Sequence, residues 1–237
     1  NESFTTKKLK EILDNSLYLS QQSILYKEVE AIKDMQQYDD IQNTFEQISN
    51  DTLYDIPLML EWNVWRAMTM LDGGNIVANL KFDDFGKPMS TAQGNMADIV
   101  CDYDSFDVTV EVTTASGQRQ YEMEGEPVAR HLGKLKKSTG KETYCLFIAP
   151  TINQASIAHF FLLQQTNISY YGGKSTIVPL ELKVFQKMVE DSYKASYIPN
   201  PTHIKKFFKF SQSAANDSSS EMDWYEKIKE KALHWLD

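Results

Sequence analysis

The sequence has few cysteines and no long apolar run, and both absences exclude classes of protein. Its two cysteines, Cys101 and Cys145, lie in apolar, strand-like segments, which favours small core residues over a disulfide or a metal site. The longest apolar stretches, 145–150 and 159–163, are far below the roughly 20 residues that a transmembrane helix needs. The chain also lacks a starting Met and opens on polar residues rather than on a signal peptide. We therefore expect a cytoplasmic protein with no membrane partner, trimmed at its start or cut from a longer polypeptide.

Positive charge is scarce as well. The chain has 24 lysines and arginines against 33 aspartates and glutamates, a formal net charge of −9 and a pI of about 5.0. Strong general binding of nucleic acid needs many cationic contacts with phosphates, so this balance argues against it for the chain alone. The basic clusters at 134–137 and 205–209 are expected to be solvated faces, although the second interleaves aromatic residues as single-strand binders do.

The sequence is rich in apolar residues, and its helical and strand-like segments alternate. Hydrophobic residues make up 42% of the 237, enough for one large domain or two small ones. Helical patterning without glycine or proline covers about 4–48, and a strong helix is predicted at 57–71. The elements predicted after it are a strand at 76–82, a loop at 83–90, strands at 98–103 and 106–114, a helix from near Gln120 or Pro127 to Lys137, a strand at 143–148, a helix at 154–165, a strand at 176–182, a helix at 185–192, loops or linkers marked by Pro199, Pro201 and 211–219, and a helix at 224–235.

This order predicts an α/β fold with a core of one helix, three strands, a helix, a strand and a helix. Further helical segments precede and follow that core. We expect a helical N-terminal extension at 1–54, the core at 55–195 and a C-terminal helical extension at 196–237.

The segment 106–114 alternates strictly between apolar and polar residues, which predicts a strand with one polar face. Glu111 lies on the polar face. A two-residue turn at Asp104-Ser105 would pair this strand with 98–103, and the resulting register places Asp98 directly across from Glu111 on the same face.

Two opposed carboxylates about 5 Å apart repel by roughly 3 kcal/mol at an effective dielectric of 20. A divalent cation with oxygen ligands would offset this repulsion. Asp98 and Glu111 would each supply one oxygen, and the carbonyl of Val112 could supply a third. The alternative interpretation is a solvated edge hairpin with two harmless carboxylates.

Three further residues are candidates for the same site. Glu61 shares a helix face with apolar residues, so its carboxylate needs a partner unless it reaches water at the rim. Glu124 and His131 are seven residues apart, on one face if the whole segment is helical. The alternative is an ordinary charged helix, with acids early and bases late, and a histidine on the surface or in the core.

These residues resemble a known family. Asp98 followed by Glu111-Val112-Thr113 is similar to the PD-(D/E)xK nuclease core of restriction endonucleases. More narrowly, Glu61, Asp98, Glu111 and the run 124–132 resemble the cleavage domain of AlwI-type type IIS restriction enzymes and their strand-nicking relatives. The resemblance covers roughly 55–182.

The resemblance implies a restriction-endonuclease-like mixed sheet and Mg²⁺-dependent hydrolysis of double-stranded DNA, with Mn²⁺ as a possible substitute. It implies a bacterial restriction-modification enzyme whose DNA-recognition domain is missing from this chain. One site would cut one strand, so a double-strand break would need a second catalytic subunit. The implied catalytic residues are Glu61, Asp98, Glu111, Glu124 and His131, with metal held by Asp98, Glu111 and Val112.

The sequence departs from the general motif at two positions, with Ala97 where proline is frequent and Thr113 where a lysine stands. That lysine would orient the water and stabilise negative charge on the phosphate oxygens. His131 is the favoured replacement. The other candidates are Arg119, Arg130, Lys134 and Lys136.

Two other functions stay open at this point. A metal-independent hydrolase with paired carboxylates, such as a glycosidase, would also use two nearby acids. A non-catalytic or regulatory module could keep the nuclease fold without its activity, and the missing motif lysine permits this.

Overall fold

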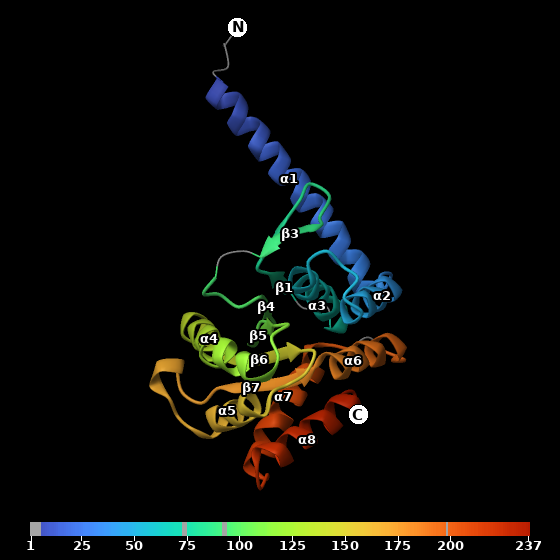
Figure 1. Ribbon diagram of the computed structural model, residues 1–237. Coiled ribbons are helices and arrows are strands. Elements are labelled where there is room, and N and C mark those ends of the chain that lie inside the picture. Colours follow the sequence, from blue (N-terminus) through green and yellow to red (C-terminus); the bar gives the residue numbers. More distant parts are fainter. Residues whose placement is uncertain (1–5, 73–74, 92–93, 198) are drawn as a thin grey trace.

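The computed structural model describes residues 6–72, 75–91, 94–197 and 199–237, and a five-stranded mixed sheet lies at its centre (Figure 1). The sheet order is β1-β4-β5-β6-β7, antiparallel from β1 to β5 and parallel from β5 to β7. The strands are β1 (Asn75–Ala78), β4 (Ile99–Asp102), β5 (Phe106–Val112), β6 (Glu142–Ala149) and β7 (Thr176–Glu181). This mixed architecture confirms the fold class expected from the sequence.

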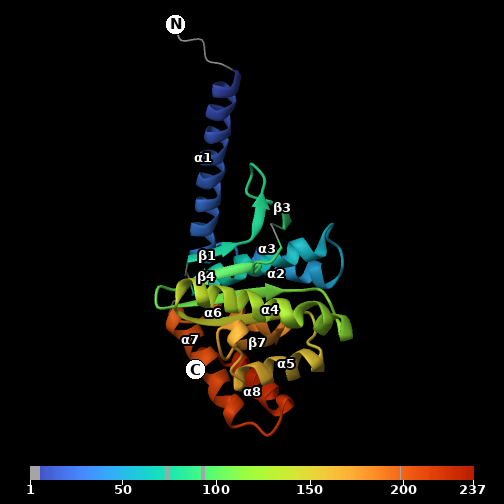
Figure 2. The ribbon, with the colours of Figure 1, turned by 90° about the vertical axis from the view of Figure 1, so that its left-hand side faces the viewer.

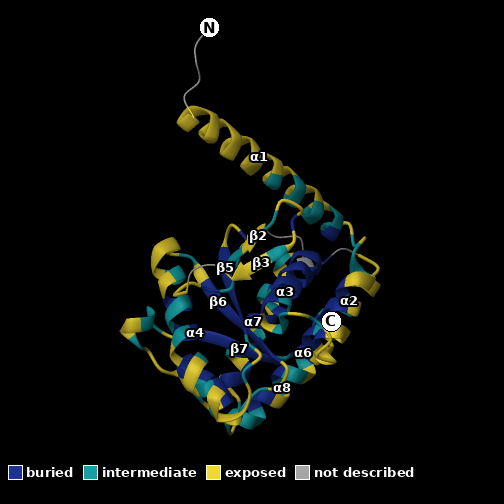
Figure 3. Cartoon of the chain, turned by 45° about the horizontal axis from the view of Figure 1, so that its top comes forward, coloured by how far each residue is buried: buried dark blue, intermediate teal, exposed yellow. Residues whose placement is uncertain are grey.

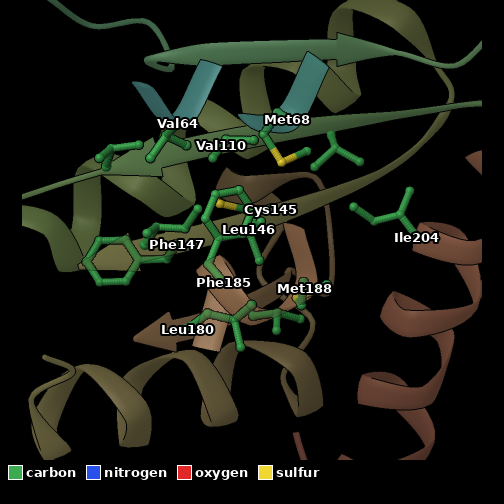
Figure 4. Packing of buried hydrophobic residues seen from close by; sticks show 14 of the residues in the cluster. Val64, Met68, Val110, Cys145, Leu146, Phe147, Leu180, Phe185, Met188 and Ile204 are labelled. Carbon is green, nitrogen blue, oxygen red and sulfur yellow. The ribbon is translucent and has the colours of Figure 1, made fainter. Parts of the chain in front are cut away.

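Helices cover both faces of the sheet, so its central strands are buried on both sides (Figure 3). One face packs on α3 and α6, and the other on α4 and α5. Their bounds are α3 (Ile56–Asp72), α4 (Gly117–Thr139), α5 (Gln154–Gln165) and α6 (Leu182–Lys194). Val110 of β5 lies beside Val64 and Met68 of α3 (Figure 4), whereas Glu111 faces α4 on the opposite side and contacts His131. Every residue of β5 is buried, which excludes the solvated edge hairpin.

The β4–β5 hairpin has the register predicted from its two-residue turn. Ile99 pairs with Val110, and the pairing continues in step to the end of β4. Asp104 in the turn has a φ of 60°, in the left-handed region that aspartate tolerates better than most residues. Extended by one residue, this register places Asp98 opposite Glu111.

The N-terminal region forms two helices from what the sequence showed as one stretch of helical patterning. α1 (Thr6–Lys33) ends at a turn in which Met35 has a φ of 61°, and α2 (Tyr38–Ser49) follows. A left-handed residue cannot continue a right-handed helix, so the region breaks there. The end of α1 packs near α3, whereas residues 6–20 are exposed and project from the body (Figure 2).

Two corrections concern the segment after α3. The strand predicted at 76–82 is divided between β1 and β2 (Leu80–Phe82), and the loop predicted at 83–90 already contains the start of β3 (Pro88–Thr91). β2 and β3 form a separate two-stranded sheet. The Asp83 carboxylate accepts hydrogen bonds from two backbone N–H groups at 2.8 Å and closes the turn between β2 and β3. The residues predicted as a loop therefore form the turn of a hairpin.

The loops predicted around Pro199, Pro201 and 211–219 are a further error, because most of this segment is helix α7 (Pro201–Asn216). The Asn200 side chain caps the helix, and Pro201 lies in its first turn, where the missing N–H is not needed. α8 (Glu221–Leu233) then ends the fold.

The basic run 205–209 belongs to α7 and is not an aromatic surface. Phe207 and Phe208 are fully buried, and Lys205 and Lys209 form ion pairs with Glu142. The two lysines therefore connect α7 to the start of β6, and the two buried rings cannot stack on nucleic-acid bases.

One hydrophobic cluster runs from Ile32 to Trp235 and so includes all three expected segments, whose boundaries stay a prediction. Cys101 and Cys145 are free and buried in it, as expected of small core residues. Within the described ranges, no helix has the length and apolarity that a membrane span requires.

At Gly133, α4 lies very close to the backbone of Tyr171, and a substitution there tests how tightly this helix is packed. A Cβ added there would lie 2.8 Å from backbone atoms of Tyr171, a contact that no side-chain rotation relieves. We expect Gly133→Ala to lower the free energy of unfolding by about 1–2 kcal/mol, because overpacking outweighs the roughly 1 kcal/mol gain in helix propensity. Thermal unfolding measures this, with Glu122→Ala at an exposed position of α4 as the control. A stabilised Gly133→Ala variant would contradict the close approach.

Candidate active site

The residues singled out from the sequence line one cavity of about 280 Å³ at the end of the β4–β5 hairpin. Asp98 directly precedes β4, and Glu111 and Val112 end β5. The cavity is therefore surrounded by the hairpin, α3, α4 and the loop that precedes β4. The predicted residues in its lining are Glu61, Asp98, Glu111, Val112, Glu124 and His131.

The Asp98 carboxylate is fixed to the hairpin by a backbone hydrogen bond. The Val112 N–H donates to Asp98 Oδ2 at 2.8 Å. Burial raises the pKa of Asp98 to about 7; the Val112 bond opposes the rise, and the charge of Glu124 adds to it. A group that sits half-titrated near neutral pH in the free protein is typical of a functional site.

Glu111 and His131 form a hydrogen bond in which neither side chain reaches much solvent. His131 Nδ1 lies 2.9 Å from Glu111 Oε1, with side-chain exposures of 9% and 6%. Burial, with Asp98 and Glu124 nearby, raises the pKa of Glu111 well above its ordinary value. Burial, together with Arg130 and Lys134, lowers the pKa of His131 to about 4. Both pKa shifts oppose the charged forms, so the metal-free pair gains little from charge attraction.

The two remaining carboxyls share this electrostatic pattern. Burial, then Asp98 and Asp55, raises the pKa of Glu61 to about 8. Burial also raises the pKa of Glu124, and the Thr113 hydroxyl partly opposes it. All four acids around the cavity thus resist ionisation, because each loses hydration and three of them lie in the field of other carboxyls.

The hairpin carries a second pair of opposed acids, and there a lysine supplies the positive charge. Asp102 pairs with Asp107 across the ladder, and Lys141 Nζ lies 2.7 Å and 3.1 Å from their carboxylates. Within the described part of the chain, no lysine or arginine forms an ion pair with Asp98 or Glu111. At the cavity end of the hairpin, Asp98 and Glu111 are likewise opposed, and no lysine or arginine among the described residues neutralises them.

The donor set fits a divalent cation. Two buried carboxylates and a backbone carbonyl are oxygen ligands of the kind that Mg²⁺ prefers. Over the described ranges, no three His, Cys, Asp or Glu side chains converge as a ready-made metal cluster. The fit therefore rests on Asp98 and Glu111 with the Val112 carbonyl, and on the repulsion that a cation would relieve.

The five candidates to replace the motif lysine lie in different places. His131 lines the cavity, whereas Arg119 lines a neighbouring hollow that shares Thr113 and Thr114 with it. Lys136 faces away and donates to the Lys174 carbonyl at 3.1 Å.

Arg130 and Lys134 contact the cavity's edge through Asn95, a residue that the sequence reasoning did not single out. Asn95 lines the cavity and accepts hydrogen bonds from both cations. The Gly94-Asn95 pair is an ordinary turn signal, and its φ of 70° at Asn95 agrees with that signal. A turn signal gives no indication of tertiary contacts, so its role was not predictable.

Gln120 is a second residue that was missed. It is fully buried and donates to the carbonyls of Ala115 and Thr151 at 2.9 Å and 2.8 Å, while its Oε1 accepts the Asn153 N–H at 2.8 Å. It thereby ties together the loops that follow β5 and β6, beside the cavity. A lone glutamine in a charged helix carries no sequence signal for this.

Comparison with known proteins agrees with this architecture. A family model described as AlwI restriction endonuclease matches residues 4–188. The crystal structure of the small subunit of the heterodimeric restriction endonuclease R.BspD6I is similar at 26% sequence identity and a TM-score of 0.66, covering 84% of this chain and 95% of that one. No curated protein matches the chain.

The family match confirms the resemblance inferred from the sequence and gives no support to a glycosidase. Family and fold support DNA cleavage as the general activity. The chain belongs to the AlwI restriction endonuclease family.

Proposed function

We propose that this chain is a Mg²⁺-dependent endodeoxyribonuclease that cuts one strand of double-stranded DNA. The observation that carries the proposal is the single cavity lined by Glu61, Asp98, Glu111, Glu124 and His131. Their raised carboxyl pKa values and the absence of a lysine or arginine ion pair to Asp98 or Glu111, within the described ranges, support a cation as the missing partner.

Asp98, Glu111 and the carbonyl of Val112 would hold the ion. Mg²⁺ bound there would supply Lewis-acid polarisation of the scissile phosphate and a lowered pKa for a coordinated water. Mn²⁺ has the same ligand preferences and is the expected substitute.

The other residues would handle the water and its proton. With Glu111 ionised, its carboxylate accepts the Nδ1 proton of His131, and that tautomer leaves Nε2 as a proton acceptor or a phosphate contact. His131 Nε2 is buried and has no hydrogen-bond partner among the described residues, which supports a role completed only by substrate. Glu61 and Glu124 would orient the attacking water. The products would carry a 5′-phosphate and a 3′-hydroxyl.

Sequence recognition would come from elsewhere. The formal net charge of −9 gives the chain little general affinity for DNA. The related R.BspD6I chain is the small subunit of a heterodimer, and we propose that this chain likewise works with a second, DNA-recognising polypeptide or domain in the bacterial cytoplasm. With one site per chain, a double-strand break of the type IIS kind needs a second catalytic subunit, and this chain alone nicks.

A non-catalytic module is the second candidate, because Thr113 stands where the nuclease motif has its lysine. On that interpretation the cavity would bind a cation without cutting DNA. Activity and metal binding together separate the two functions.

Glu111→Gln tests catalysis without removing the hydrogen-bonding capacity at that position. We expect nicking of supercoiled plasmid in Mg²⁺ or Mn²⁺ to fall by more than about a hundredfold, the scale of losing one stabilising group at a transition state. Asp98→Asn should do the same. The metal-free fold at pH 8 should be no less stable than wild type, since the substitution removes a buried acid whose ionisation the site opposes.

The matched control is Glu122→Gln on the exposed side of α4, which should nick like wild type. Undiminished nicking by Glu111→Gln would refute the site. A wild-type chain that gains thermal stability with Mn²⁺ yet never nicks would favour the non-catalytic module.

The pH dependence of stability tests the carboxyl cluster itself. Because a raised pKa favours the protonated acid in the folded state, Glu61 stabilises the metal-free fold fully below about pH 4.5 and loses that contribution as the pH rises through about 8. We expect the fall in unfolding temperature between these limits to be shallower by a few degrees in Glu61→Gln than in wild type. Mg²⁺ should reduce the fall in wild type, because it binds the ionised form. Equal slopes with and without the substitution would contradict the burial of this group's charge.

A further inference from the structure

We propose that Arg130, Lys134 and Asn95 form a binding subsite for a backbone phosphate of DNA, immediately beside the catalytic cavity. The proposal deepens the DNA-cutting function and rests on it. It concerns a phosphate next to the scissile one, where the backbone leaves the metal site.

The subsite is built from two elements that meet at the cavity's edge. Lys134 Nζ lies 2.6 Å from Asn95 Oδ1 and 3.3 Å from the Asn95 carbonyl, and Arg130 donates from Nη1 to the same Oδ1. Arg130 and Lys134 are four residues apart on α4, so their side chains lie on one face of the helix. Two cations thus converge on one neutral amide oxygen.

A neutral oxygen is a weak partner for two cations. Phosphate oxygens make shorter and stronger charge-assisted hydrogen bonds with lysine and arginine than an amide does. Glu126 engages the Nε of Arg130 at 3.0 Å and leaves Nη1 turned to Asn95. Lys134 forms no ion pair with a carboxylate among the described residues. The arrangement therefore holds two donors in place for an anion of higher charge.

The location fits the path of a cut strand. His131, which contacts Glu111, lies between Arg130 and Lys134 in the sequence of α4, so the two cations flank a residue of the catalytic cavity. Asn95 itself lines that cavity. A phosphodiester at the metal site would bring a neighbouring phosphate toward these donors.

Asn95 acts as a positioning residue. Its φ of 70° is unfavourable for most side chains and tolerated by asparagine, so the amide can be presented from a tight turn. The turn lies three residues before Asp98. The two cations therefore also hold the loop that carries a metal-binding acid.

Salt dependence of DNA binding tests the subsite directly. The intact chain is titrated onto a short fluorescent duplex at several salt concentrations without Mg²⁺, so that no cutting occurs. Lys134→Ala and Arg130→Ala should each lower the slope of log affinity against log salt by about 1, because each removes one phosphate contact. Lys137→Ala is the matched control: it lies on the same helix, binds the Tyr170 carbonyl and should leave the slope unchanged.

Asn95→Asp separates a phosphate subsite from a merely structural contact. The aspartate keeps the shape and the acceptor, so a structural role predicts unchanged or greater thermal stability and wild-type DNA binding. A phosphate subsite predicts about tenfold weaker binding, or about 1.4 kcal/mol, since a fixed negative charge occupies the anion's place.

Three results would overturn the subsite: a wild-type salt slope in both cation variants, wild-type binding by Asn95→Asp, or a wild-type chain that binds no duplex at low salt. Failure of the proposed nuclease function would give a different set of results. In that case Glu111→Gln leaves nicking unchanged or no nicking exists, while the slopes of Lys134→Ala and Arg130→Ala still fall.

Discussion

Four carboxyl groups gather around one cavity at the end of the β4–β5 hairpin, and this close packing of acids governs the chemistry of the site. Asp98 and Glu111 meet because a two-residue turn sets the hairpin register, and the Val112 N–H holds Asp98 there. At the other end of the same hairpin, Lys141 forms ion pairs with the opposed carboxylates of Asp102 and Asp107. At the cavity end, no lysine or arginine among the described residues forms an ion pair with Asp98 or Glu111, and burial raises the pKa of both acids, so a divalent cation from solution would favour their ionised forms.

The fold supplies the burial that makes this constraint strong. α4 lies over the polar face of β5, so Glu111 is 4% exposed although it belongs to an alternating strand. The same helix presents His131 to that carboxylate and carries the two cations that grip Asn95. One helix thus buries Glu111, supplies the histidine that contacts it and carries the two cations at Asn95, whereas α3 contributes Glu61 from the opposite side.

The sequence predicted the part of the site that depends on local rules. Strand alternation and turn length are local, so the pairing of Asp98 with Glu111 followed from residues 98–111 alone. The second sheet and α7 were not predicted from the sequence. A segment rich in turn residues or serine has the same composition whether it forms a free loop or is ordered by tertiary packing. Asn95 and Gln120 act through partners 31 to 39 residues away, and a single sequence contains no signal for such contacts.

Anomalous diffraction from crystals soaked in Mn²⁺ would show whether the cavity binds a divalent cation. We expect one peak at the cavity, within bonding distance of the carboxylates of Asp98 and Glu111, and its loss in Glu111→Gln. A crystal that binds Mn²⁺ elsewhere and leaves this cavity without a peak would contradict the account, because Asp98 and Glu111 would then not be metal ligands.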